Sequence, residues 1–244
     1  MTAQTDAAIA ARALPLLDLT DLGDSCTDAT IAALCENAQA GPVAAVCVWP
    51  AFVPACRRRL GTSAVRIATV VNFPAGGEDV EATVAETRAT LLEGAQEIDL
   101  VLPYRALLRG DEAAARAMVE AVRAVCGPAC LKVILETGTL AEPGTIAAAS
   151  RLALEAGADF IKTSTGKSPV SATPEAAATM LAAIRESGRP AGLKVSGGLR
   201  SVADAATYLA LADRLMGPGW VSPATMRLGA SSLYGALTAA KAAA

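Results

Sequence analysis

Three of the five lysines in this chain lie within short apolar segments, although burying an ammonium group is costly. They are Lys132, Lys162 and Lys194, in a chain that otherwise carries sixteen arginines. Lys162 is the most informative, because Phe160 and Ile161 predict a buried strand that ends at this lysine. A lysine amine attacks carbonyl groups only when it is neutral, and burial or a neighbouring cation favours that form. The pattern indicates amine chemistry at Lys162, unless its side chain only extends from the strand end to solvent.

Two more charged residues lie where strands are predicted. Asp99 interrupts an apolar run, so its carboxylate is either paired with a buried cation or used in catalysis. A salt bridge to Lys132 or Lys194 is compatible with both roles. Lys194 lies in the predicted strand that follows the one carrying Lys162. Two neighbouring ammonium groups oppose each other's protonation, so the pKa of one of them falls.

Glycine-rich turns follow the last two predicted strands. Their residues include Gly197, Gly198, Arg200, Gly229, Ser231 and Ser232. Glycine lets the backbone approach a ligand, and the amides at a helix N-terminus bind phosphate. With Lys167 also close to a strand end, the turns predict an anion site in a protein whose net charge is −3. The expected ligand is a small phosphorylated molecule.

Short apolar segments alternate with helical patterns along the whole chain. The predicted strands are Leu16–Thr20, Val43–Val48, Val65–Val71, Glu97–Leu102, Leu131–Glu136, Asp159–Thr163, Gly192–Val195 and Met226–Gly229. Most are apolar at successive positions, which is typical of parallel strands covered on both faces. The alternation predicts an α/β fold, a single (β/α)8 barrel over residues 1–244 with residues 1–13 as an N-terminal helix or extension. A doubly wound open sheet is the alternative, but no G-x-G-x-x-G turn follows the first strand.

Helical periodicity predicts which faces of the helices pack on the barrel. The stripes are Ile31, Leu34 and Ala38; Val80, Val84 and Leu91; Met118, Val122 and Val125; and Met180, Leu181 and Ile184. Thr173-Pro174 and Ser201-x-x-Asp204 predict the starts of two helices. In such a barrel the catalytic side chains come from the carboxyl ends of several strands, where this chain repeatedly places polar residues.

Composition excludes several classes of function. The chain has no histidine, and its six cysteines form no C-x-x-C pair, which removes Ser-His-Asp triads and most zinc sites. Aromatic residues make up 3% and the basic run Arg57-Arg58-Arg59 is short, so we expect no nucleic-acid partner. No apolar run reaches the roughly 18 residues of a membrane span, and residues 1–14 do not resemble a secretory signal. We therefore expect a cytoplasmic protein with no membrane partner.

Several of these segments together resemble the deoxyribose-phosphate aldolase family of class I aldolases. The resemblance spans nearly the whole chain and is most specific in the segments DFIKTSTGK (159–167), RIATVVNFP (66–74), PYRA (103–106) and KVILETG (132–138). It implies a (β/α)8 barrel that reversibly cleaves 2-deoxyribose 5-phosphate to acetaldehyde and glyceraldehyde 3-phosphate. It also implies that no metal or organic cofactor is required.

The resemblance further implies roles for individual residues. Lys162 would form the Schiff base, and Lys194 would lower its pKa. Asp99 would move protons together with Lys194 and an ordered water. The remaining substrate-binding residues would be Asp18, Thr20, Cys47, Thr165, Gly166, Lys167, Gly197, Gly198, Arg200, Gly229, Ser231 and Ser232. The Cys47 thiol would be exposed to reactive aldehydes.

Two features depart from the family. Val195 stands where relatives often carry proline or alanine, which would alter the loop after the seventh strand. Longer relatives can end in a tyrosine that reaches the site, whereas no aromatic residue follows Tyr234 here. Proton transfer would then depend on water, Asp99 and Lys194.

Two other functions stay open on the sequence alone. A different barrel enzyme acting on a phosphosugar, such as an isomerase or a transaldolase-like enzyme, would use the phosphate site with other carbonyl chemistry. A non-catalytic sensor of phosphorylated metabolites would need the glycine turns but not two lysines at strand ends. The expected partners are small phosphosugar and aldehyde substrates. Barrels often pair through helical faces, so a homodimer is the assembly to test.

Overall fold

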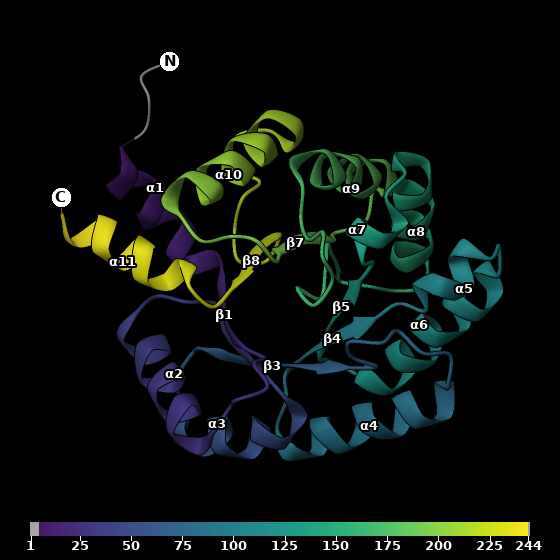
Figure 1. The fold of residues 1–244 in the computed structure, drawn as a ribbon, viewed down its shortest axis with the longest axis horizontal. Coiled ribbons are helices and arrows are strands. Elements are labelled where there is room, and N and C mark those ends of the chain that lie inside the picture. Colours follow the sequence, from purple (N-terminus) through teal and green to yellow (C-terminus); the bar gives the residue numbers. More distant parts are fainter. Residues whose placement is uncertain (1–4, 244) are drawn as a thin grey trace.

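Eight parallel strands form a closed barrel in sequence order in the computed structural model, which describes residues 5–243 (Figure 1). The strands are β1 (Leu17–Asp21), β2 (Ala45–Val48), β3 (Arg66–Val71), β4 (Glu97–Val101), β5 (Cys130–Ile134), β6 (Phe160–Lys162), β7 (Gly192–Ser196) and β8 (Met226–Ala230). Because β1 also pairs with β8, the sheet has no free edge. The predicted single-domain (β/α)8 barrel is confirmed, and the open sheet is excluded.

Helices surround the barrel on its outer face (Figure 1). The α-helices are α1 (Asp6–Ala13), α2 (Asp28–Ala40), α3 (Val53–Leu60), α4 (Val80–Glu93), α5 (Tyr104–Leu108), α6 (Glu112–Cys126), α7 (Thr137–Leu140), α8 (Pro143–Glu155), α9 (Pro174–Ser187), α10 (Val202–Met216) and α11 (Leu233–Ala242). The 3-10 helices are η1 (Leu14–Leu16) and η2 (Pro50–Phe52). Helix α1 forms part of the extension predicted for residues 1–13, and residues 1–4 lie outside the described part. No helix within residues 5–243 is both long and apolar enough to cross a membrane.

Two predicted helix starts have the expected caps. The Thr173 side chain accepts a hydrogen bond from the Ala176 amide at the start of α9. Ser201 and Asp204 exchange reciprocal hydrogen bonds at the start of α10, which is a capping box with aspartate in the third helical position. These caps fix where the loops after β6 and β7 end.

Helix α4 buries a different face from the one that hydropathy predicts. Its fully buried side chains are Thr83, Thr87 and Thr90, whereas Val80, Val84 and Leu91 are only partly buried. Each threonine hydroxyl donates to a carbonyl oxygen in the preceding turn of the chain. Threonine therefore packs there without an unpaired hydroxyl, and its polarity misleads a hydropathy pattern.

Apolar side chains form two separate clusters. The larger one includes buried residues of both the strands and the surrounding helices. The smaller one consists of Leu22, Ala45, Cys47, Ala68 and Val70. Strand alternation places the β2 and β3 members of this smaller cluster inside the barrel. Because most of these side chains are small, they leave room there for long charged side chains from the other strands.

Candidate active site

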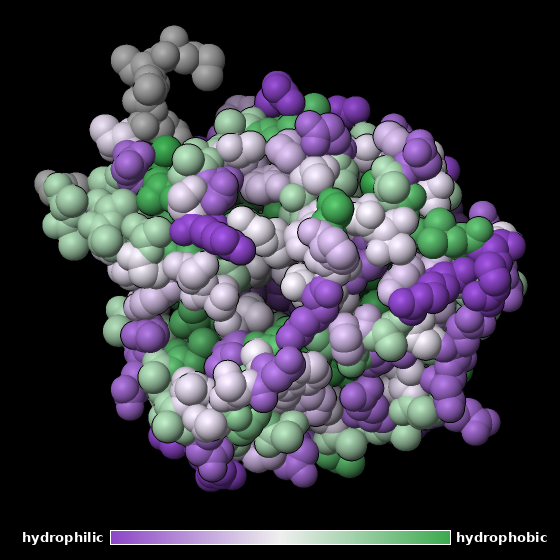
Figure 2. Space-filling model, viewed as in Figure 1, coloured by the Kyte–Doolittle hydropathy of each residue, from purple (hydrophilic) through white to green (hydrophobic). Residues whose placement is uncertain are grey.

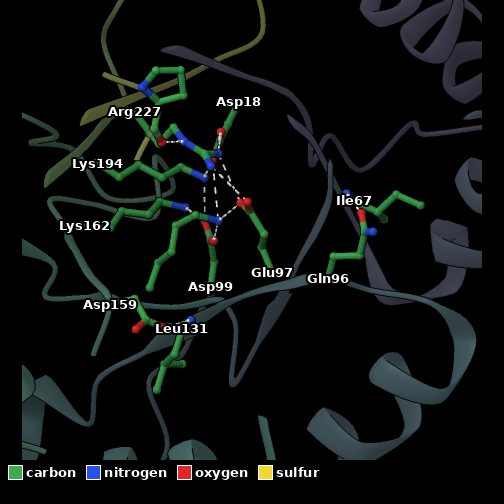
Figure 3. A network of polar contacts seen from close by, with 12 residues as sticks. Asp18, Ile67, Gln96, Glu97, Asp99, Leu131, Asp159, Lys162, Lys194 and Arg227 are labelled. Atoms are coloured by element: carbon green, nitrogen blue, oxygen red, sulfur yellow. Dashed lines mark hydrogen bonds and ion pairs between the residues drawn. The ribbon is translucent and has the colours of Figure 1, made fainter. Parts of the chain in front are cut away.

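Six charged side chains inside the barrel form a closed ring of alternating sign (Figure 3). In order around the ring they are Asp18, Lys194, Asp99, Lys132, Glu97 and Arg227. Each neighbouring pair meets at 2.6–3.0 Å between a nitrogen and a carboxylate oxygen. Every member is at most 6% exposed. Three acids and three bases thus balance one another away from water.

The strand register explains why these side chains meet. Asp99 is the register partner of Lys132, and Lys194 is the register partner of Arg227. These pairs therefore lie at similar heights in the barrel. A buried ion pair is stable only when its geometry recovers the cost of removing both charges from water. The ring provides this geometry, since each of its members contacts at least two groups of opposite charge.

Lys162 is a fourth cation, and it joins the ring at one point only. Its Nζ donates to Asp99 Oδ2 at 2.8 Å, the same oxygen that accepts from Lys194 Nζ at 2.7 Å. Among residues 5–243, no other carboxylate forms an ion pair with Lys162. Its side chain is 2% exposed. A protonated Lys162 would therefore be the excess positive charge of a buried cluster that is otherwise neutral.

The surroundings shift the pKa values of these groups in opposite directions. Burial lowers the pKa of Lys162, and the Lys194 ammonium lowers it further, while Asp99 opposes both. Burial lowers the pKa of Lys194, but the carboxylates of Asp18 and Asp99 raise it more. Burial raises the pKa of Asp99, but the positive charges of Lys132, Lys162 and Lys194 lower it more. The pKa of this carboxyl therefore falls well below its usual value. Lys162 is thus the lysine of this cluster that loses its proton most easily.

A cavity of about 260 Å³ opens at the carboxyl ends of β1, β6, β7 and β8. Ten of the predicted substrate-binding residues line it: Thr20, Thr165, Gly166, Lys167, Gly197, Gly198, Arg200, Gly229, Ser231 and Ser232. Figure 2 shows a hollow near the centre of one face, bordered mainly by neutral and hydrophilic residues. The loops after four different strands are therefore brought together, as the sequence predicted.

Comparison with known proteins identifies the family. The model of the DeoC/LacD family aldolases matches residues 8–232. The chain belongs to this aldolase family. It is an enzyme, an aldolase of the lyase class, and its resemblance to deoxyribose-phosphate aldolases is confirmed. Because the chain belongs to a family of enzymes, the alternative of a non-catalytic sensor of phosphorylated metabolites is excluded as its main function.

Solved structures agree with the family. A candidate deoxyribose-phosphate aldolase from Coccidioides immitis is 30% identical, with 93% of this chain and 85% of that chain covered and a TM-score of 0.82. A candidate deoxyribose-phosphate aldolase from Toxoplasma gondii ME49 is 28% identical, with 96% and 94% covered and a TM-score of 0.90. The tetrameric deoxyribose phosphate aldolase from Aeropyrum pernix is 24% identical, with 98% and 94% covered and a TM-score of 0.79. This last likeness shows the shared fold.

Five predicted site residues do not line the cavity: Asp18, Cys47 and the three predicted catalytic residues Asp99, Lys162 and Lys194. Asp18 belongs to the charged ring, and Cys47 is fully buried beside Ala45 and Ala68 in the small apolar cluster. Burial raises the pKa of the Cys47 thiol. The expected exposure of this thiol to aldehydes is therefore wrong, because the interior side chains of β2 and β3 pack against one another.

The two helices that begin at the cavity differ in how their amides are used. At α10, the Asp204 carboxylate accepts hydrogen bonds from the amides of Arg200 and Ser201. At α11, the N-cap Ser232 makes no side-chain capping bond. The Arg200 and Ser201 amides at the start of α10 are thus already paired with Asp204, as the predicted capping box implies. The α11 start and the turn before α10 are better placed to receive an anion.

The loop after β6 is held by a residue that sequence reasoning missed. Glu136 is 2% exposed, and its carboxylate accepts hydrogen bonds from the Thr165 amide, the Thr165 hydroxyl and the Ser168 hydroxyl. It therefore fixes the segment that supplies Gly166 and Lys167 to the cavity. The ring members Glu97 and Arg227 were also missed. The signal that revealed Asp99, a charge inside an apolar strand, would have revealed both of them.

Val195, one of the departures from the family, lies away from the cavity. Its side chain is fully buried in the larger apolar cluster. Strand alternation explains this, because Lys194 and Ser196 on either side point into the barrel. The expected effect of Val195 on the loop is therefore not supported.

Gly229 gives Lys194 the space to cross the barrel. A Cβ atom at this position would lie 2.9 Å from Lys194 Cε and 2.8 Å from Ser196 Oγ. Both distances are shorter than van der Waals contact, so a larger residue would push the lysine out of the ring. Gly229 thus has a steric role besides lining the cavity.

We expect Gly229→Ala to destabilise the aldolase by about 1–3 kcal/mol, because overpacking a filled site forces side chains out of their preferred positions. Thermal unfolding would measure the change. Gly235→Ala on α11 is the matched control, since a Cβ atom there meets nothing within 4 Å. It should be neutral or slightly stabilising, because alanine favours helix. Equal unfolding temperatures for both variants would contradict the steric role.

Proposed function

We propose that this aldolase reversibly cleaves 2-deoxy-D-ribose 5-phosphate to acetaldehyde and D-glyceraldehyde 3-phosphate through a Schiff base on Lys162. The observation that carries the proposal is that Lys162, at the end of β6, is the excess cation of a buried, balanced cluster, and that the loop after β6 lines the cavity. The named activity of the relatives from Coccidioides immitis and Toxoplasma gondii supports this substrate.

The reaction begins when the neutral Lys162 amine attacks the C1 aldehyde of the open-chain sugar. Loss of water from the adduct gives an iminium ion, which accepts the electron pair released as the C2–C3 bond breaks. The C3 hydroxyl loses its proton, and glyceraldehyde 3-phosphate leaves. The remaining enamine takes up a proton at C2, and water then releases acetaldehyde and restores the amine.

Asp99 and Lys194 are placed to move these protons. Asp99 Oδ2 contacts the Nζ atoms of both Lys162 and Lys194, so one carboxylate oxygen joins the nucleophile to a second ammonium. Proton transfer by a positioned group typically contributes about 10²–10⁴-fold to a rate. In this proposal Asp99 and Lys194 act through an ordered water, as the resemblance to the family implies.

The cavity would hold the phosphate end of the sugar. Gly197 and Gly198 have φ angles of 86° and 85°, a backbone conformation that favours glycine. Lys167 and Arg200 add positive charge to the cavity wall. Binding the remote phosphate orients the reacting carbonyl toward the amine and lowers the barrier.

Reductive trapping tests the proposal. With acetaldehyde and borohydride, we expect a single ethyl adduct that peptide mapping places on Lys162. An adduct on Lys132 or Lys194, or none on any lysine, would contradict the assignment. Trapping of a ketose phosphate in place of acetaldehyde would favour the transaldolase-like alternative.

The state of the cysteines supports a cytoplasmic location in this proposal. All six are free thiols. Disulfides persist in oxidising compartments, whereas thiols stay reduced in the cytosol. A homodimer also remains part of the proposal, and light scattering in solution would test it.

A further inference from the structure

Neither Arg227 nor Glu97 forms a hydrogen bond or an ion pair with Lys162, whose partner in the ring is Asp99. Arg227 joins Asp18 and Glu97, with its guanidinium 2.6 Å from Asp18 Oδ1 and 3.0 Å from Glu97 Oε1. Glu97 in turn contacts Lys132 at 2.6 Å. Without these two residues, three short ion pairs would still join Asp18 through Lys194 and Asp99 to Lys132, and only the longer Lys132–Asp18 contact of 3.6 Å would close the set. Arg227 and Glu97 connect Asp18 to Lys132 through contacts of 2.6–3.0 Å (Figure 3).

Arg227 is held rigidly in this position. Its Nε donates to the Pro223 carbonyl at 2.6 Å, and its guanidinium lies 5.6 Å from the centre of the Phe160 ring. The Phe160 ring in turn occupies the space beside Gly192, where a Cβ atom would lie 2.3 Å from it. Such a fixed guanidinium cannot turn away to solvent when the charge around it changes.

We propose that Arg227 and Glu97 are positioning residues that hold the ring at zero net charge and thereby keep the Lys162 amine free of its proton without contacting it. The inference rests on the proposed function of Lys162. It adds to that function, because two residues on the opposite side of the ring, and not only Asp99 and Lys194, would then control the protonation of the amine.

The groups around Lys162 leave few other ways to adjust the charge. They are Asp18 on β1, Cys47 on β2, Glu97 and Asp99 on β4, Lys132 on β5, Lys194 on β7 and Arg227 on β8. Burial raises the pKa of the Cys47 thiol, which favours its neutral form. The carboxylates and cations of the ring hold one another in their charged forms. Lys162, with one partner, is therefore the group that responds first to a change in the balance.

The sign of the response follows from this balance. Removing the positive charge of Arg227 leaves the ring at −1, which favours the Lys162 ammonium and raises the pKa of the amine. Removing the negative charge of Glu97 leaves the ring at +1, which lowers that pKa. Removing both restores neutrality. Interior charges separated by one or two ion pairs interact strongly enough to shift a pKa by about one unit.

Trace labelling with acetic anhydride at a series of pH values would measure the proton affinity of Lys162 directly. Peptide mapping would report its reactivity relative to the exposed Lys241 of the same chain. We expect the midpoint for Lys162 to rise by about one pH unit in Arg227→Gln and to fall by about one unit in Glu97→Gln. The double variant should return to the wild-type midpoint, a result that a purely structural role would not give.

Arg116→Gln and Glu155→Gln are the matched controls, because they remove the same charges from an exposed ion pair on the outside of the barrel. Neither should move the Lys162 midpoint. If Arg227→Gln does not fold, Glu97→Gln and the double variant still test the balance. Unchanged midpoints, shifts of the same sign, or a double variant that does not return would overturn the inference.

Failure of this inference can be told apart from failure of the proposed function. If wild-type Lys162 traps acetaldehyde but its labelling midpoint does not change when Arg227 or Glu97 is replaced, only the inference fails. If the midpoints shift as expected but no aldehyde is trapped, the charge balance stands and the Schiff-base mechanism fails.

Discussion

Replacing Lys162 with methionine is expected to lower the rate of aldol cleavage by at least about 10⁴-fold, a loss of roughly 5 kcal/mol of transition-state stabilisation. Methionine keeps the length of the side chain but has no amine with which to form an iminium. The variant should fold, because Asp99 keeps Lys132 and Lys194 as partners and the ring stays complete. Coupled assay of glyceraldehyde 3-phosphate formation would measure the rate.

Lys167→Met is the control for this variant. Lys167 lines the cavity and forms a 3.4 Å ion pair with the exposed Asp24, but it belongs to no part of the ring. Its loss should weaken binding of the phosphosugar and leave acetaldehyde trapping on Lys162 intact. Substantial cleavage by Lys162→Met, with normal thermal unfolding, would exclude Lys162 as the nucleophile.

Asp99→Asn is expected to destabilise the aldolase by about 3–5 kcal/mol, because it leaves buried ammonium groups without their shared counter-charge. Asp99 is fully buried and contacts Lys132, Lys162 and Lys194 at 2.7–2.8 Å. The variant should also lose about 10²–10⁴-fold in activity, through its role in proton transfer. Urea unfolding and steady-state kinetics would measure the two effects separately.

The pH dependence of Asp99→Asn gives a further check on its cause. The pKa of Asp99 is lower in the folded protein than in the unfolded chain, so its stabilising effect is complete above an unfolded pKa of about 4. That effect is lost as the pH falls through the folded-state pKa. The stability difference between wild type and variant should therefore be largest near neutral pH and shrink in acid.

Asp213→Asn provides the matched control for this carboxylate. It removes the same charge from a half-exposed ion pair with Arg12, whose atoms meet at 2.8 Å. Exposed or half-exposed pairs contribute about 0–1 kcal/mol, so this variant should unfold close to wild type. A similar loss of stability in both variants would argue that burial of Asp99 is not the cause.

The ring changes the explanation for the reactive lysine. From sequence, burial and a neighbouring ammonium on Lys194 are together the expected reasons for a low pKa at Lys162. In the structure, burial is the larger cause, and Asp99 holds both lysines through one oxygen. Lys194 itself stays charged because it lies between Asp18 and Asp99. Lys162 differs from it mainly in having one carboxylate partner.

The sequence by itself determined the barrel and the location of its chemistry. Alternation of apolar segments with helical periodicity is a local property, so each of the eight strands could be placed within a few residues. Charges inside apolar strands, such as Asp99 and Lys162, mark buried ionisable groups wherever the fold places them. Polar and glycine-rich segments after these strands identified most of the cavity wall, because parallel strands bring their carboxyl ends to one face.

Only the tertiary structure decided which charges meet. Arg227 contacts Asp18 across 209 residues of chain and Glu97 across 130, and no local pattern encodes such pairs. The buried threonine face of α4 likewise depends on packing and on hydroxyl hydrogen bonds that hydropathy does not describe. Closure of the barrel brings β1, β4 and β8 within the reach of one guanidinium. Whether Lys162 keeps its proton therefore depends on contacts that exist only in the folded chain.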